Sequence, residues 1–255
     1  MAIRELGEMT WEEVRDLDRA RTVAILPTGA IEAHGPHLPL NADVVIAGAM
    51  ARAGAEALAR EGLETLILSP LAYTAASFAA GFPGTLSVGG DTVTALIVDL
   101  ADALTRQGFL ALAVANAHLD PAHLESIAEA GRLAREGGMI PVIGPDITRK
   151  PWALRLSEEF KSGACHAGRY ETSVLMSERN DLVREEIRGT LPPFPVSISQ
   201  AIRAGAKTFE EAGGARAYFG WPADASAEEG RATVEELGKI LAEAILLELT
   251  PGSAS

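Results

Sequence analysis

The feature that most constrains the fold is a regular alternation of short apolar runs and longer helical segments in the first part of the chain. The four β-rich runs span residues 22–26, 64–69, 109–115 and 139–143. Segments with helical periodicity lie between or after them, at 44–60, 92–106 and 122–136. Strands that alternate with helices in this order predict an α/β fold with right-handed crossovers and a mostly parallel sheet covered by helices on both faces.

Further elements are predicted towards both ends of the chain. Thr10–Glu13 and Ser226–Glu229 have the capping-box pattern, the first before a short helix and the second before a long helix to about Leu249. The break LPPF at 191–194 precedes an extended run at 195–199. Because no repeat or linker divides the sequence, we expect one domain over residues 1–250 and a short tail at 251–255.

Charge and composition restrict the partners. The chain has 22 Lys and Arg against 35 Asp and Glu, a formal net charge of −13, which argues against a nucleic-acid partner. Its longest apolar run, 109–115, is too short to cross a bilayer, and its first residues lack the apolar stretch of a signal peptide. One cysteine, Cys165, excludes an internal disulfide. We therefore expect a soluble cytoplasmic protein with no membrane partner.

Candidate metal ligands gather in two short segments, 29–43 (GAIEAHGPHLPLNAD) and 116–123 (NAHLDPAH). Both begin just beyond a predicted strand, at the sheet edge where open α/β folds bind ligands. The five candidates are Glu32, His34, Asp43, His118 and Asp120. Mixed imidazole and carboxylate donors suit Zn²⁺ or Mn²⁺, with Fe²⁺ also possible. Five donors exceed one tetrahedral site, so we predict two metals with Asp43 as a possible bridge, although any single one of these residues could instead be a cap or a surface pair.

These residues also carry a resemblance to a known family. PTGAIEAHGPHLPLNAD resembles the signature of the creatininase (creatinine amidohydrolase) family. Similar stretches follow in order over most of the chain: GFPGTLSV, NAHLDP, HAGRYETSVL and GWPADASAEEG. The resemblance implies a three-layer α/β sandwich, hydrolysis of an amide-type C–N bond at a dinuclear Zn²⁺ or Mn²⁺ site, and commonly a homohexamer.

The resemblance also implies roles for the histidines and carboxylates. One metal would be bound by Glu32, Asp43 and His118, and the other by His34, Asp43 and Asp120. His166 resembles the catalytic histidine, which moves a proton between the attacking water and the leaving nitrogen. Outside the ligand set, we expect His37 and His123 to support the site by orienting carboxylates, although His123 could equally lie at the surface. Glu171 could hold His166 or cap a helix.

The chain departs from the family pattern at several positions. Asp120 stands where creatininase proper has a glutamate ligand, and Arg169 replaces the glutamate that many members carry in HAGE. Arg169 could meet an anionic or carbonyl-rich substrate, or form a salt bridge with an acidic neighbour. Segment 145–165 is predicted to cover the site as a lid, with Trp152 closing over the substrate or anchoring the loop to the core. Ser77 is a further candidate for substrate contact.

The leading functional hypothesis is a dinuclear metal hydrolase that opens a small cyclic amide or formamide with a hydroxide shared by two metals. Creatinine itself is disfavoured because the lid segment is short and no second tryptophan precedes His166. The alternatives are ring opening of a cyclic polyol ketone by C–C cleavage and a metal-binding protein without catalysis. Peptide trimming is a further family option, disfavoured by the small, closed site that we expect.

Overall fold

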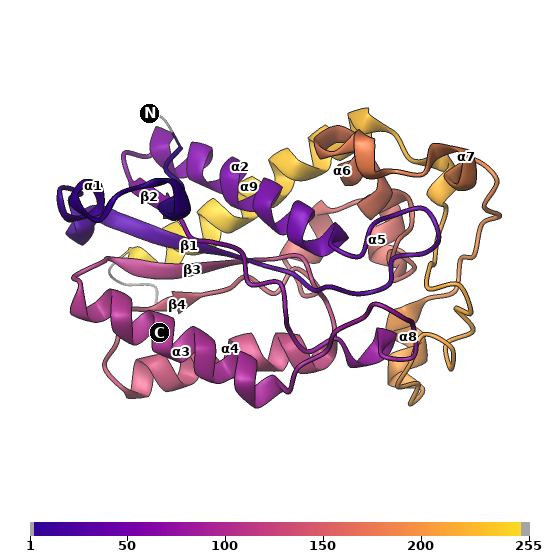
Figure 1. Cartoon of the computed structure of the whole chain (residues 1–255), viewed down its shortest axis with the longest axis horizontal. Coiled ribbons are helices and arrows are strands. Elements are labelled where there is room, and N and C mark those ends of the chain that lie inside the picture. Colours follow the sequence, from indigo (N-terminus) through magenta and orange to yellow (C-terminus); the bar gives the residue numbers. More distant parts are fainter. Residues whose placement is uncertain (1–2, 251–255) are drawn as a thin grey trace.

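The computed structural model describes residues 3–250, and its centre is a four-stranded parallel sheet in the order β2-β1-β3-β4 (Figure 1). The strands are β1 (Thr22–Thr28), β2 (Glu64–Ile67), β3 (Ala111–Asn116) and β4 (Val142–Ile143). The predicted parallel sheet is therefore confirmed. β4 is shorter than the predicted run because Pro141 has no N–H to give to the ladder.

The long helices form one layer on each face of the sheet, as Figure 1 shows. On one face lie α2 (Ala42–Arg60) and α9 (Ala227–Leu249), and on the other α3 (Gly90–Arg106) and α4 (Pro121–Glu136). All four predicted segments are confirmed to within two residues. The fold is thus the three-layer α/β sandwich that the sequence predicts.

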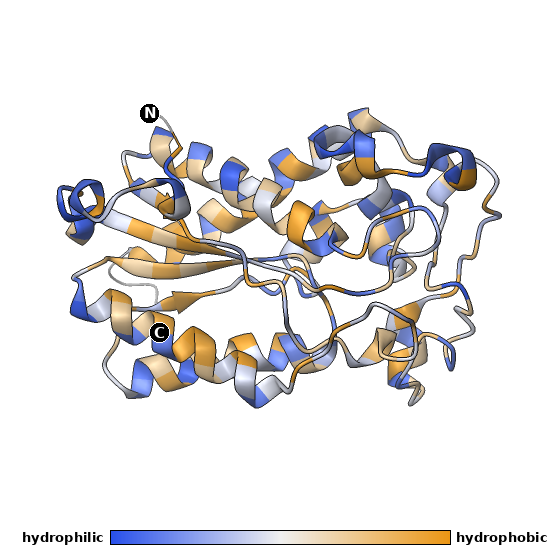
Figure 2. Ribbon diagram, in the orientation of Figure 1, coloured by the Kyte–Doolittle hydropathy of each residue, from blue (hydrophilic) through white to orange (hydrophobic). Residues whose placement is uncertain are grey.

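Each face of the sheet has its own hydrophobic core. Val23 and Ile25 of β1 pack towards α2 and α9, whereas Ala24 and Leu26 pack towards α3 and α4. Every residue of β1 and β3 is buried, so these strands are apolar on both faces (Figure 2).

Shorter elements complete the chain. The α-helices are α1 (Trp11–Arg15), α5 (Glu158–Ser162), α6 (Arg169–Glu178), α7 (Glu185–Arg188) and α8 (Ile198–Arg203). The 3₁₀ turns are Leu6–Glu8, Arg19–Arg21, Ser77–Ala79, Trp152–Arg155, Asn180–Leu182 and Pro222–Asp224. Both predicted capping patterns form their caps, because Thr10 and Ser226 each accept a hydrogen bond from a backbone N–H three residues later.

The structure differs from the prediction around the start of α8. The extended run predicted at 195–199 is wrong in its second half, since Ser197 caps α8 and the helix begins at Ile198. The predicted tail, 251–255, lies outside the described residues. Within residues 3–250, no helix is long and apolar enough to cross a membrane.

Close contact between α2 and α9 brings the C-terminal helix against the first long helix. Gly238 of α9 lies so near α2 that a Cβ there would be 2.5 Å from the Cβ of Ala53 and 2.7 Å from its carbonyl carbon. Gly48 of α2 faces only the flexible end of Arg52, at 3.4 Å. The two helical glycines therefore differ in whether a methyl group can be accommodated.

We expect Gly238→Ala and Gly48→Ala to change stability in opposite directions. Gly238→Ala should lower the free energy of unfolding by about 1–3 kcal/mol, because overpacking forces two helix backbones apart. Gly48→Ala should raise it by roughly 0.5–1 kcal/mol through the helix propensity of alanine. Urea unfolding followed by circular dichroism measures both, and equal effects would contradict the close packing of α2 on α9.

Candidate metal centre

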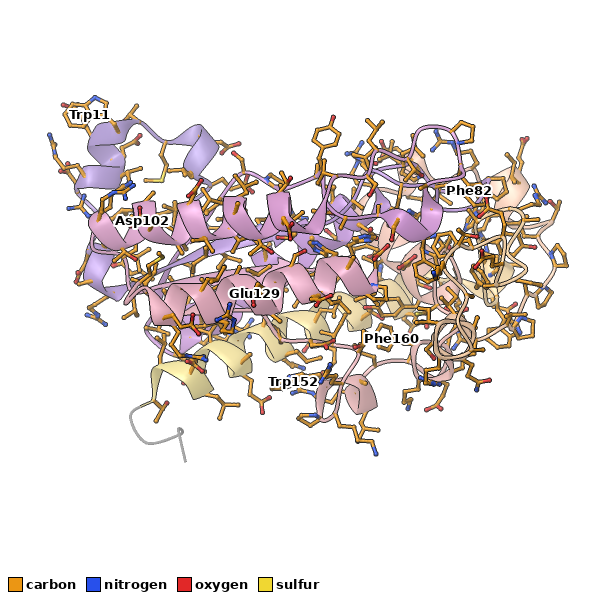
Figure 3. The ribbon with its side chains drawn as sticks, turned by 90° about the horizontal axis from the view of Figure 1, so that it is seen from below. Trp11, Phe82, Asp102, Glu129, Trp152 and Phe160 are labelled. Atoms are coloured by element: carbon orange, nitrogen blue, oxygen red, sulfur yellow. The ribbon has the colours of Figure 1, made fainter. Side chains whose placement is uncertain are left out.

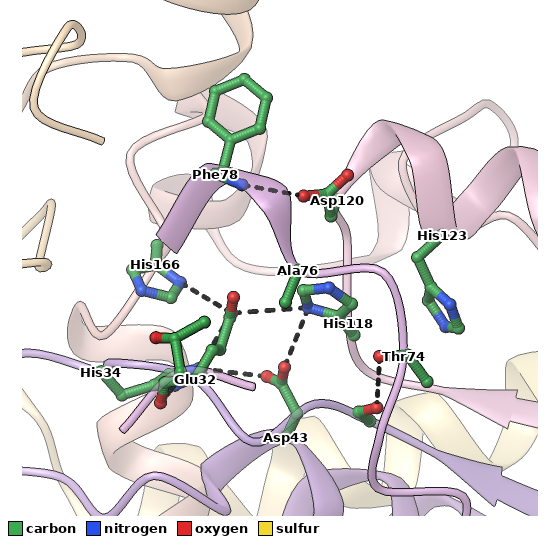
Figure 4. Close-up of polar contacts among 12 residues, drawn as sticks. Glu32, His34, Asp43, Thr74, Ala76, Phe78, His118, Asp120, His123 and His166 are labelled. Atoms are coloured by element: carbon green, nitrogen blue, oxygen red, sulfur yellow. Dashed lines mark hydrogen bonds and ion pairs between the residues drawn. The ribbon is translucent and has the colours of Figure 1, made fainter. Parts of the chain in front are cut away.

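A cluster of buried histidines and carboxylates lies at the C-terminal edge of the sheet (Figure 4). Glu32 and His34 lie on the loop after β1, Asp43 in the first turn of α2, and His118 just after β3. The turn before α6 and the first turn of that helix add two more, His166 and Glu171. The chain therefore gathers four segments at one point of the sheet edge.

Asp43 lies at the middle of this cluster. Its Oδ1 is 3.1 Å from Nε2 of His34, and its Oδ2 is 3.0 Å from Nδ1 of His118. Glu32 Oε1 is 3.4 Å from the same His118 nitrogen, and Glu171 Oε2 is 3.6 Å from Nε2 of His34. Asp43 thus connects a Glu32–His118 half of the cluster with a His34–Glu171 half.

Backbone carbonyls orient all three imidazoles in the same way. His34 Nδ1 contacts the carbonyl oxygen of Glu32 at 3.2 Å, and His118 Nε2 contacts that of Ala75 at 2.8 Å. His166 Nε2 contacts the carbonyl oxygen of Ala33 at 2.9 Å. A carbonyl can only accept, so each of these ring nitrogens donates its N–H. The other nitrogen of each ring faces the cluster, as metal-binding histidines require.

Burial and charge shift the pKa values of these groups. Burial alone would lower the pKa of His34 and His118, but neighbouring carboxylates outweigh it. The pKa of His34 rises to about 10, with Asp43 contributing most, and that of His118 rises well above its usual value, with Glu32 contributing most. Burial raises the pKa of Glu171 to about 8. Without a bound cation, protons therefore balance the buried negative charge at pH 7.

His166 differs from the other two imidazoles. Burial, followed by the nearby charge of His34, lowers its pKa to about 4, so the ring is neutral at pH 7. Its Nδ1 lies 3.8 Å from Glu32 Oε1, and its ring stacks at 4.2 Å on Phe209 and at 4.4 Å on His34. A neutral Nδ1 that faces the cluster is able to accept a proton.

The donor set fits divalent cations. Three overlapping groups have ligand atoms within 4.8 Å of one another: Glu32–His34–His166, Glu32–Asp43–His118 and His34–Asp43–Glu171. Within residues 3–250, Oε2 of Glu32 is buried without a hydrogen-bond partner. A buried carboxylate oxygen of this kind is costly unless a cation binds it. Imidazole nitrogens with carboxylates are donors that Zn²⁺ and Mn²⁺ accept.

Asp120, which is predicted as a ligand, contacts groups outside the cluster in the structure. Its Oδ2 accepts hydrogen bonds from Ser77 Oγ at 3.0 Å and from the N–H of Phe78 at 3.1 Å, and its Oδ1 caps α4 through the N–H of Ala122 at 2.9 Å. Figure 4 shows it directed at Phe78, apart from the cluster. Glu171, expected outside the ligand set, is the carboxylate that lies beside His34, with Oε2 3.6 Å from Nε2.

The three predicted substrate-binding residues are not among those that line the cleft, although Ser77 contacts Asp120, which is. Arg169 Nε lies 3.2 Å from Glu229 of α9, which is the salt-bridge alternative. Trp152 packs against the core under α2 and α9, with the Arg155 guanidinium 5.6 Å above its ring (Figure 3). Segment 145–165 is anchored there by the tryptophan instead of presenting it to a substrate.

His37 and His123 lie outside the cluster and connect its loops to other elements. Nε2 of His37 is 2.9 Å from Oγ1 of Thr172 on α6. Nε2 of His123 is 3.0 Å from Oδ1 of Asn116, which also accepts the N–H of His118. Burial lowers the pKa of each to about 3, so both are neutral at pH 7 and act through hydrogen bonds.

A cleft of about 1120 Å³ leads from the cluster to solvent. Glu32, His118, His166 and Phe209 line the cleft beside the cluster, and Arg203 is also among its lining residues. The small, closed site expected from the sequence is therefore wrong. No sequence signal pointed to Phe209, which lies in an ordinary polar stretch, TFEEAGG.

An open parallel sheet with a buried histidine–carboxylate cluster at its C-terminal edge is typical of metal-dependent hydrolases. The family model for creatinine amidohydrolase matches residues 7–245, so the chain belongs to the creatininase family of hydrolases. This confirms the resemblance on which the sequence analysis relied.

Two relatives and two solved structures illustrate this similarity. A mycofactocin precursor peptide peptidase of Mycobacterium tuberculosis (strain CDC 1551 / Oshkosh) is 32% identical over 239 residues, 90% of this chain and 85% of that protein. Creatinine amidohydrolase of Pseudomonas putida is 30% identical over 213 residues, 75% and 80% of the two chains. A mutant creatininase complexed with creatine and a manganese creatininase have TM-scores of 0.73 and 0.71, each with 26% identity over 98% of this chain and 100% of theirs.

We expect metal binding at pH 7 to release roughly two to three protons per chain. His34, His118 and Glu171 have raised pKa values and hold protons at this pH, and each must lose one to become a ligand. Affinity should therefore rise as the pH increases from 6 to 9. Calorimetric titrations of the metal-free chain in buffers of different ionisation enthalpy count these protons. Metal binding without proton release would contradict His34, His118 and Glu171 as ligands.

Proposed function

We propose that this creatininase-family hydrolase cleaves the C–N bond of an amide with two divalent cations, zinc or manganese. Glu32, Asp43 and His118 would hold one cation, and His34, Asp43 and Glu171 the other, with Asp43 shared. Such a pair would lower the pKa of a bound water and polarise the substrate carbonyl. The observation that carries the proposal is the common orientation of the imidazoles, each held by a backbone carbonyl with its free nitrogen towards the cluster.

His166 is the group suited to move the proton. Its Nε2–H is committed to Ala33, so the proton from the attacking water would be taken at Nδ1 and delivered to the departing nitrogen. The low pKa of the ring keeps Nδ1 unprotonated at neutral pH. The rings of Phe209 and Phe219, with centroids 4.2 and 6.5 Å from that of His166, keep the imidazole in an apolar surrounding.

The size of the cleft favours a peptide-type amide over a small ring. Its volume, about 1120 Å³, exceeds the roughly 300–1000 Å³ that is usual for sites of drug-sized molecules. Trp152 does not cover it. The peptidase named among the relatives supports this substrate class. A small cyclic amide is the second candidate, supported by the creatinine amidohydrolase relative, and both candidates involve a C–N bond and not a C–C bond.

We expect Glu171→Gln to weaken binding of one of the two metals by roughly 10- to 100-fold, because it removes an anionic donor beside His34. Asp120→Asn makes the same change of charge outside the cluster and should retain both metals. Metal content per chain after dialysis, measured by elemental analysis, separates the two variants. Loss of metal in Asp120→Asn alone would restore the ligand set expected from the sequence.

The experiment that tests the function is His166→Ala. We expect it to retain both metals and to lower kcat by roughly 10²- to 10⁴-fold, because only the proton carrier is removed. Amine release from short peptides and formamides, and ring opening of creatinine to creatine, identify the substrate class in the wild-type chain. Loss of metal together with activity would make His166 a ligand, and full activity in the variant would exclude it from catalysis.

A further inference from the structure

A buried carboxylate that no motif predicted connects two of the family-like segments. Glu159 lies on α5, within segment 145–165, and is only 2% exposed. Its Oε1 accepts hydrogen bonds from the N–H groups of Arg169 and Trp221, both at 2.8 Å, and its Oε2 accepts one from the N–H of Tyr170 at 2.6 Å. The carboxylate therefore joins the first turn of α6 to the GWPAD segment.

Glycines make room for this carboxylate in both segments. A Cβ on Gly168, in HAGRYETS, would lie 2.7 Å from Oε1 of Glu159 and 2.5 Å from the carbonyl oxygen of Phe219. A Cβ on Gly220, which has φ of +87°, would overlap Oε1 of Glu159 as well. These two glycines allow Glu159 to reach the backbone, which explains their places in the two motifs.

The turn that Glu159 contacts is strained and carries two residues of the proposed site. Ala167, between His166 and Gly168, has a left-handed backbone with φ of +48°. Such a conformation persists only when the surrounding structure holds it. Here Glu171 accepts the N–H of Ala167 at 2.6 Å, and His166 accepts the N–H of Phe219 at 2.8 Å through its carbonyl. Glu159 binds the next two N–H donors of the helix.

We propose that Glu159 is a positioning residue. It holds the turn between His166 and Glu171 and thereby fixes both side chains at their places in the histidine–carboxylate cluster. The proposal rests on the proposed function, since it assigns Glu171 to one of the two metals. Glutamine cannot replace Glu159, because its amide NH₂ would face at least one backbone N–H donor. Lys161 and Cys165 line the cleft and follow Glu159 in the same segment. The hydrogen bonds of Glu159 therefore also hold the backbone of these two residues near the site.

The test compares Glu159→Gln with Glu158→Gln in titrations of the metal-free full chain with Mn²⁺. Glu158 is the matched control, because it is adjacent on α5, loses the same charge and is exposed beside Lys161. We expect Glu159→Gln to weaken one Mn²⁺ site by roughly 10- to 100-fold and to leave the Glu32–Asp43–His118 site unchanged. Glu158→Gln should bind as the wild type does. Unchanged binding at both sites in Glu159→Gln would overturn the proposal.

Glu159→Asp, which retains the charge on a shorter side chain, should bind with intermediate affinity. It also replaces Glu159→Gln if that variant does not fold. A purely structural role would lower the melting temperature of the variants without selective loss at one metal site.

Amide hydrogen exchange tests the contact independently of metal. Exchange at Arg169, Tyr170 and Trp221 should be faster in Glu159→Gln than in Glu158→Gln. If the wild-type chain took up no Mn²⁺, the proposed function would fail, whereas the exchange data would still decide the role of Glu159. Equal exchange in the two variants would overturn that role.

Discussion

The carboxylate of Asp43, buried between two imidazoles, is the interaction on which the rest of the site depends. Several acidic groups in a dry environment repel one another, and this arrangement is tolerable only with positive charge among them. Asp43 contacts both halves of the cluster from the first turn of α2. The dipole of that helix favours a negative charge at this position. Gly29 allows this approach, since a Cβ there would be 2.6 Å from the N of Val44. The position of the carboxylate thus follows from the packing of α2 against the end of β1.

Backbone groups, more than side chains, hold the side chains of the cluster in place. The carbonyls of Glu32, Ala75 and Ala33 orient the imidazoles, and the N–H of Ala167 orients Glu171. These loops are irregular, but their ends continue into β1, β3 and α6, which are packed in the two cores. The proposed function requires the ligands and the proton carrier to be in place before the substrate arrives, and these backbone contacts would hold them there. The open cleft then leaves room for a substrate larger than a single ring.

Much of the site could be predicted from local sequence. Glu32 and His34 lie on the loop after β1, Asp43 lies in the first turn of α2 at the end of that loop, and His118 follows β3. Parallel strands bring their C-terminal ends to one edge. Asp120 lies apart from the cluster and caps α4, and the sequence carries a signal for that cap: an Asp before an N-terminal proline, here Pro121, is typical of a helix cap. Arg169 and Trp152 form contacts with α9 and the core that no spacing reveals, because their partners are far away in the chain.

The sequence by itself determined the layers of the fold and the side chains that reach the sheet edge. Hydrophobic periodicity and caps act over a few residues, so they specify each strand and helix wherever it lies. Only the tertiary structure decided that Glu171 and not Asp120 faces His34, and that Glu159 lies beneath the turn before α6. The first depends on where α6 packs against a loop more than a hundred residues earlier in the chain. The second depends on the contacts of α5 with α6 and Trp221 and on the space left by single glycines. Packing of this kind sums many weak contacts between distant segments, which no local pattern encodes.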